Sequence, residues 1–158
     1  MSDLVSRMAG IEPDSVLARV VAKRGDIFAL TEKTMQAALT PVEPGGLPNA
    51  LRAALASRVA RLNGEVAMAD HFASLAGDDP MARIADLDFR GDDARSRAVI
   101  RHCDLVAANP KAATGGDIEA LRQAGVSEPD IVRLSELVAF ISYQVRVVAG
   151  LRLMRETL

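Results

Sequence analysis

Apolar side chains recur at intervals of three and four residues through most of the chain, which is the spacing of one face of an α-helix. No run alternates between apolar and polar positions with turn signals at both ends, so no strand is predicted. Segments rich in Gly, Pro, Asn and Asp separate the periodic runs. The pattern predicts an all-α protein with six or seven helices in a single domain, residues 1–158, with helices near residues 2–8, 13–24, 26–39, 48–75, 94–108, 118–123 and 131–154.

Side chains that can cap a helix stand at several of the predicted starts. Ser2 and Asp26 come before the first and third runs, Asp92 or Asp93 comes before the fifth, and Ser127 begins Ser-Glu-Pro-Asp before the last. The side-chain oxygens of these residues can accept hydrogen bonds from the N–H groups that the first turn of a helix leaves without a partner. The predicted boundaries therefore rest on capping chemistry as well as on periodicity.

The central stretch Leu47–Leu75 carries the most regular pattern and is predicted to be one long helix that begins near Pro48. At 100° per residue, one face of this helix is apolar along its whole length. The small residues on that face would allow another helix to approach closely. The residues predicted to form the face are Leu51, Leu55, Val59, Leu62, Val66, Ala69 and Ala73.

The last predicted helix, residues 131–154, is apolar around most of its circumference. Such a helix must be buried, either at the centre of the protein or in a subunit interface. In a chain of 158 residues, a homo-oligomer is the expected way to cover it. Glu136, Gln144, Arg146 and Arg152 interrupt the apolar stretch 134–153, which is too polar to be predicted as a membrane span.

Composition excludes several classes of function. The net charge is −2, with both signs interspersed, so no basic surface for nucleic acid is expected. The single Cys rules out an internal disulfide and a C-x-x-C pair, and two His with no ligand spacing make a metal site unexpected. No Gly-rich phosphate loop follows a strand, so no cofactor is predicted. The first residues show no secretory signal, and a cytoplasmic protein is expected.

The central stretch resembles the carboxymuconolactone decarboxylase / alkylhydroperoxidase D (AhpD)-like family, in its peroxidase-related branch. Family members with peroxidase chemistry read L-P-x-x-L-R-E-L, then R-V-A-x-L-N-G-C-x-x-C-x-x-x-H. The resemblance continues in the second half of the chain, covers about two thirds of it in the right order, and implies the all-α, oligomeric AhpD-like fold. The segments that carry it are Leu47-Pro48, Leu51-Arg52, Arg58-Val59-Ala60, Leu62-Asn63-Gly64, and the stretches 117–127, 130–134 and 138–151.

The reactive residues of that family are absent at the matching positions. In register from Asn63-Gly64, the two family cysteines fall on Glu65 and Met68, the family His falls on Phe72, and the upstream Glu falls on Ala53. In the family, the two thiols can form a disulfide, and a Glu–His relay activates the thiol, because the thiolate is the nucleophile. Glu and Met can do neither, so the sequence excludes thiol-dependent peroxidase or disulfide-reductase chemistry here and leaves a degenerate pocket at Ala53, Glu65, Met68 and Phe72.

Three residues remain as weak catalytic candidates. Glu65 could be a general base in the old pocket, although an ordinary ion pair with Arg61 is favoured. His71 is one position from the family His, a rotation of about 100°, and is favoured as a solvated or interface residue. Cys103, with Arg101 and His102 beside it in sequence, is favoured as an inert core residue.

Three further residues are candidate ligand contacts. Arg58 flanks the apolar face of the central helix and could hold an anionic ligand, although an exposed helical Arg is commonplace. Tyr143 and Gln144 lie on the predicted buried last helix, where they could hydrogen-bond into a pocket or across a subunit interface.

These observations leave three hypotheses on function. The first is a non-thiol pseudo-peroxidase that acts as a binding or assembly subunit in antioxidant or catabolic pathways. Its partners would be further copies of the chain, an active paralogue or a small-molecule ligand. The second is a lyase of the lactone decarboxylase kind, with acid–base groups in the same pocket. The third and weakest is a one-Cys peroxidase through Cys103.

Overall fold

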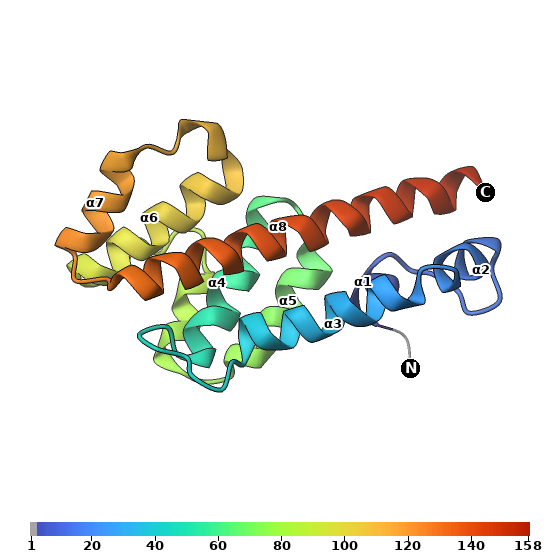
Figure 1. Ribbon diagram of the computed structural model, residues 1–158, viewed down its shortest axis with the longest axis horizontal. Helices are drawn as coiled ribbons and strands as arrows, with labels where there is room; N and C mark the ends of the chain where they lie inside the picture. The colour runs from blue at the N-terminus through green and yellow to red at the C-terminus, as the bar shows by residue number, and fades with distance from the viewer. Residues whose placement is uncertain (1–2) are drawn as a thin grey trace.

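A helix of 30 residues, α8 (Glu128–Thr157), runs along the molecule, and the other helices lie beside it (Figure 1). The computed structural model describes residues 3–158, and Ser2, predicted as a helix cap, lies outside them. Within these residues the chain is all-α, as predicted. The other elements are α1 (Leu4–Met8), α2 (Val16–Ala22), α3 (Gly25–Leu39), α4 (Asn49–Leu62), α5 (Val66–Ala76), α6 (Ala94–Ala108), α7 (Gly115–Gln123) and the 3₁₀ helices η1 (Pro80–Ala85) and η2 (Pro110–Ala112).

Two of the predicted caps are confirmed, and one is wrong. The Asp93 side chain accepts from the N–H of Ser96 at the start of α6, and Ser127 accepts from the N–H of Asp130 at the start of α8. Asp26 lies inside the first turn of α3, which begins at Gly25 and has no side-chain cap. An acidic side chain in a first turn still favours the helix, because it faces the positive end of the helix dipole.

The predicted long helix over Leu47–Leu75 is wrong, because the chain breaks between α4 and α5. Gly64 has φ of +76°, a conformation that favours glycine. The N–H of Glu65 donates to the carbonyl of Ala60, and the N–H of Gly64 donates to that of Arg61, which is the Schellman pattern that ends a helix. The Asn-Gly pair therefore stops α4, and α5 begins a separate helix that packs against it.

The break changes which side chains of the second half are buried. Val66, predicted on the apolar face, is 61% exposed, and Ala73 is only half-buried. The residues of α5 that face the core are Met68, Ala69, Phe72 and Ala76. The Ser57 hydroxyl on α4 donates to the carbonyl of Ala69 at 2.8 Å, which fixes the two helices against each other.

The hydrophobic core runs between α4, α5, α6 and α8, with α1 closing one end. One side of α8 is fully buried, and it carries Leu134, Leu137, Ile141 and Val148. By length and composition α8 could also cross a membrane, but 44% of its most apolar window is buried inside the protein. A buried core helix of a globular protein has the same length and composition.

Arg52 fixes the loop that leads from α3 into α4. Its guanidinium donates to the carbonyls of Ala38, Pro44 and Leu47, at 2.7 to 3.0 Å. Only 3% of Arg52 is exposed, so these bonds replace water for a buried charge. The Leu-Arg pair of the family resemblance therefore has a structural part in this chain.

Candidate functional site

The apolar positions of the degenerate motif are closed to solvent. Met68 and Phe72 are fully buried on α5, and Ala53 on α4 is 2% exposed. All three belong to the main hydrophobic core. The place where the family resemblance puts a redox centre is therefore filled by packed side chains.

Glu65 is buried beside them and pairs with Arg152 on α8. The Glu65 Oε1 accepts from Arg152 Nη1 at 2.8 Å, and Glu65 is 7% exposed. The other nitrogens of Arg152 donate to the carbonyl of Met8 at the end of α1. The ion pair therefore joins three distant segments of the chain. The second oxygen of Glu65, Oε2, is buried and has no hydrogen-bond partner among residues 3–158.

The predicted pair between Arg61 and Glu65 is wrong. Arg61 pairs with Asp70 at 3.1 Å, and both side chains are exposed. The reason is the turn at Asn63-Gly64, because residues four apart share a helix face only when the helix is continuous. Once the helix breaks, Glu65 turns inward, toward Arg152.

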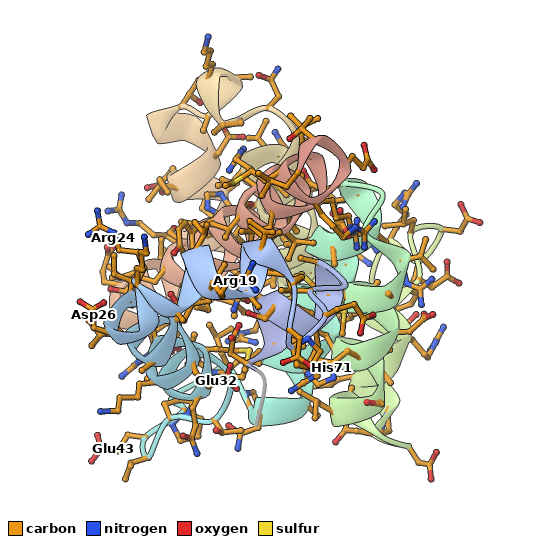
Figure 2. All side chains as sticks on the ribbon, turned by 90° about the vertical axis from the view of Figure 1, so that its right-hand side faces the viewer. Arg19, Arg24, Asp26, Glu32, Glu43 and His71 are labelled. Carbon is orange, nitrogen blue, oxygen red and sulfur yellow. The ribbon has the colours of Figure 1, made fainter. Side chains whose placement is uncertain are left out.

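His71 does not complete a relay with Glu65. It is half-buried on α5, with its ring 5.4 Å from that of Phe72. Burial lowers the pKa of His71, the charge of Arg7 lowers it further, and Glu32 opposes the shift. In the end-on view of Figure 2, His71 and Glu32 lie on the same lower side of the molecule. The groups that act on His71 thus come from α1 and α3.

Cys103 lies fully buried in α6 and is a free thiol. Burial raises the pKa of the Cys103 thiol far above its ordinary value, and the neighbouring Asp104 carboxylate adds to the shift. A thiol in this environment stays protonated at neutral pH, and the thiolate is the reactive form. The geometry therefore opposes a one-Cys peroxidase at Cys103.

Arg58 was predicted as an exposed residue that could hold an anion, and this is wrong. It is 1% exposed, and its guanidinium donates to both carboxylate oxygens of Asp104, at 2.6 and 2.8 Å. It also donates to four backbone carbonyls: that of Ile84 in η1, and those of Asp86, Leu87 and Phe89 in the segment that follows. Hydrogen bonding to Asp104 raises the pKa of Arg58 against the effect of burial. No donor is left for a ligand.

Residues 143 and 144 occupy opposite environments. Tyr143, predicted to be buried, is 41% exposed, and its hydroxyl lies 3.4 Å from the hydroxyl of Thr31 on α3. Gln144 is fully buried as predicted, but neither its amide oxygen nor its nitrogen has a hydrogen-bond partner among residues 3–158. Gln144 thus forms no part of an evident polar site.

Sequence reasoning missed the residues that pair with Glu65 and Arg58. Arg152 and Asp104 are the partners of Glu65 and Arg58, and each comes from a helix distant in sequence. His102, a neighbour of Cys103 in sequence, is 5% exposed, and neither of its ring nitrogens has a hydrogen-bond partner among residues 3–158. A sequence feature that could have pointed to Arg152 is its position as a polar residue within the apolar stretch of the last helix.

Three of the cavities lie away from the degenerate motif, whereas a fourth, of about 510 Å³, lies beside it, with Arg61 and Val66 in its wall. One of about 490 Å³ and another of about 190 Å³ lie between α3 and α8, and Arg52 and Tyr143 are in their respective walls. A third, of about 370 Å³, lies between η1 and the start of α6. Ala53, Glu65, Met68 and Phe72 line none of these three. Among residues 3–158, no group of three His, Cys, Asp or Glu side chains could hold a metal ion.

Comparison with protein-family models, with curated proteins and with solved structures finds no match to this chain. The resemblance to the AhpD-like family therefore remains a prediction from the residues of the chain itself.

Proposed function

We propose that this protein is a non-thiol, AhpD-like pseudo-peroxidase that acts as a binding or assembly subunit. The observation that carries the proposal is the closed state of the degenerate motif. Ala53, Met68 and Phe72 are core residues, and Glu65 is held by Arg152. A catalytic site needs a cavity in which reacting groups converge on a substrate, and these four positions offer packing instead.

A second feature, an exposed apolar surface, supports assembly. Helices α3 and α8 lie along each other, and their shared outer surface is here called the α3–α8 seam (Figure 1). Ile27 of α3 and Tyr143 of α8 line a cavity between the two helices and are 43% and 41% exposed. Leu30 of α3 is 62% exposed. An apolar surface of this kind is typical of an interaction site. A second copy of this chain is the partner that we propose for it, in a cytoplasmic homo-oligomer.

An assay of thiol-dependent peroxidase activity tests the proposal, which predicts that this activity is absent. Purified protein with a dithiol reductant and an organic hydroperoxide is expected to consume no hydroperoxide above the rate in buffer. The variant Cys103→Ala is expected to behave in the same way. Thiol-dependent consumption of hydroperoxide that persists in Cys103→Ala would contradict the proposal, because the chain has no other thiol.

One observation favours the lyase as a second candidate. The Oε2 atom of Glu65 is buried and has no hydrogen-bond partner in the described part of the chain, and a buried carboxylate oxygen with no hydrogen bond is uncommon and costly. Such an oxygen could take a proton from a substrate that enters by displacing neighbouring side chains. Release of CO₂ from carboxymuconolactone, lost in Glu65→Gln and kept in Asp70→Asn, would establish this function in place of the first.

A further inference from the structure

One face of α8, the 30-residue helix that runs along the molecule in Figure 1, is exposed over most of its length. The residues of this face follow one another at alternating steps of three and four, which is the spacing of the seam between two helices in a coiled coil. At 1.5 Å per residue, the face is roughly 30 Å long. We call it the α8 stripe, and its members, all of them exposed, are Val132, Glu136, Ala139, Tyr143, Arg146, Gly150 and Leu153.

The uncharged members of the stripe alternate in size. Val132, Tyr143 and Leu153 are large apolar residues, and Val132 and Leu153 are 56% and 63% exposed. Large apolar side chains in line on one face form a patch of the kind that marks protein–protein contacts. Ala139 and Gly150 lie between them and leave room for side chains of another helix, since a Cβ at Gly150 would meet no atom within 4 Å.

The two charged members of the stripe have opposite signs and no ion-pair partner among residues 3–158. The carboxylate of Glu136 forms no hydrogen bond with these residues and acts on the buried Arg52 only through its charge. The guanidinium of Arg146 donates to the carbonyl of Ser142 on its own helix and to no carboxylate. Glu136 and Arg146 lie roughly 15 Å apart along the helix axis, so they do not pair within one chain. A second helix on the stripe can supply the opposite charge to both.

The stripe is complementary to itself when two copies of α8 run antiparallel. In such a pair, the layers of the seam repeat symmetrically about a two-fold axis. If Glu136 of one copy lies level with Arg146 of the other, the axis passes midway between Ala139 and Tyr143, and the charge pair occurs twice. The other layers then join a large side chain to a small one, or two apolar residues: Val132 with Gly150, Ala139 with Tyr143, and Leu153 with Pro129.

The charges favour this alignment over the others that keep the two stripes face to face. A shift by seven residues in one direction places Glu136 level with Leu153, and a shift in the other direction places it level with Ala139. Both shifts leave the carboxylate and the guanidinium against apolar residues. A parallel pair in register places Glu136 against its own copy and Arg146 against its own copy, and like charges at an interface are strongly unfavourable.

We propose that a second copy of this chain packs its α8 stripe antiparallel against the first, in the alignment set by two Glu136–Arg146 pairs. This inference rests on the proposed assembly role and specifies the interface that carries it. The apolar layers bury surface, and the charge pairs set the alignment and exclude wrong partners more than they add affinity. Tyr143 belongs to both the stripe and the α3–α8 seam, because its hydroxyl lies 3.4 Å from that of Thr31 on α3.

Exchange of the two charges tests the alignment. Glu136→Arg and Arg146→Glu each place like charges in two layers of the dimer, so each variant alone should dissociate at least about tenfold more readily than the wild type. Mixed one to one, the two variants should form a heterodimer. The charge introduced by Glu136→Arg then faces the one introduced by Arg146→Glu, and the unaltered Arg146 and Glu136 face each other. Light scattering coupled to size-exclusion chromatography measures the mass of each variant and of the mixture.

A matched control separates the stripe from general charge effects. Glu156→Arg makes the same change at an exposed position of α8 outside the stripe and should leave the dimer intact. All the altered side chains are exposed, and circular dichroism checks that the variants stay helical. A wild-type oligomer that both charge reversals leave intact, or a mixture that does not restore the dimer, would overturn this interface alone. A monomeric wild type would overturn the assembly role together with it.

Discussion

Arg58 is the residue whose removal should cost the most stability for a single side chain. Replacement by Ala leaves Asp104 and four backbone carbonyls without their donor. Breaking a buried, hydrogen-bonded ion pair by removing one partner costs about 3–5 kcal/mol. Asp104 is 31% exposed and can recover some water, so the lower half of this range is expected. Urea unfolding, followed by circular dichroism, measures the free energy directly.

Two control variants test whether the loss of stability comes from the buried hydrogen bonds of Arg58. Arg61→Ala removes the same side chain from the same helix, where its partner Asp70 is 64% exposed, and should cost less than about 1 kcal/mol. Arg58→Lys keeps the charge but lacks the planar fork, so it should fall between the wild type and Arg58→Ala. If Arg58→Ala were no less stable than Arg61→Ala, Arg58 would not hold the segment after η1. Its guanidinium would then be free to bind an anion, contrary to the structure.

The remaining predictions concern the thiol, the imidazoles and two glycines. Cys103 should react with a thiol-titrating reagent only after denaturation, because its pKa is raised by burial; fast reaction of the native protein would contradict this. Burial lowers the pKa values of His71 and His102 in the folded protein, so below about pH 6.5 the unfolded chain binds more protons than the folded one. The free energy of unfolding should therefore decrease as the pH is lowered, which urea unfolding at pH 7.5 and 5.5 would measure. Gly64→Ala should lose about 1 kcal/mol through its positive φ alone, whereas Gly150→Ala, inside α8 with open space around it, should gain up to about 1 kcal/mol. Equal effects at the two glycines would refute the turn at Gly64.

The fold class could be predicted from the sequence because the helical spacing of apolar residues is local information. Capping at Asp93 and Ser127 was readable for the same reason. The break at Asn63-Gly64 was missed, although Asn-Gly is a helix-ending signal. The apolar residues on the two sides of the turn keep the spacing of a single continuous helix. Periodicity alone therefore cannot reveal the turn.

The polar contacts of the candidate site could not be predicted, because their partners are distant in the sequence. Glu65 and Arg152 are 87 residues apart, and Arg58 and Asp104 are 46 apart. Local rules pair a charge with its neighbours on the same helix, as in the predicted Arg61–Glu65 pair. What the sequence did indicate is that the reactive residue types are missing at the motif positions. The structure adds that Glu65 is buried there with Arg152.

The mass of the protein in solution tests most directly whether it is an assembly subunit. Light scattering coupled to size-exclusion chromatography should give a multiple of the 16.8 kDa chain for the wild type. Ile27→Glu places a charge on the α3–α8 seam and should shift the protein to a monomer that stays helical. Leu75→Glu, which charges an exposed leucine on α5, should keep the oligomer. A monomeric wild type, or an oligomer that Ile27→Glu leaves intact, would contradict the account.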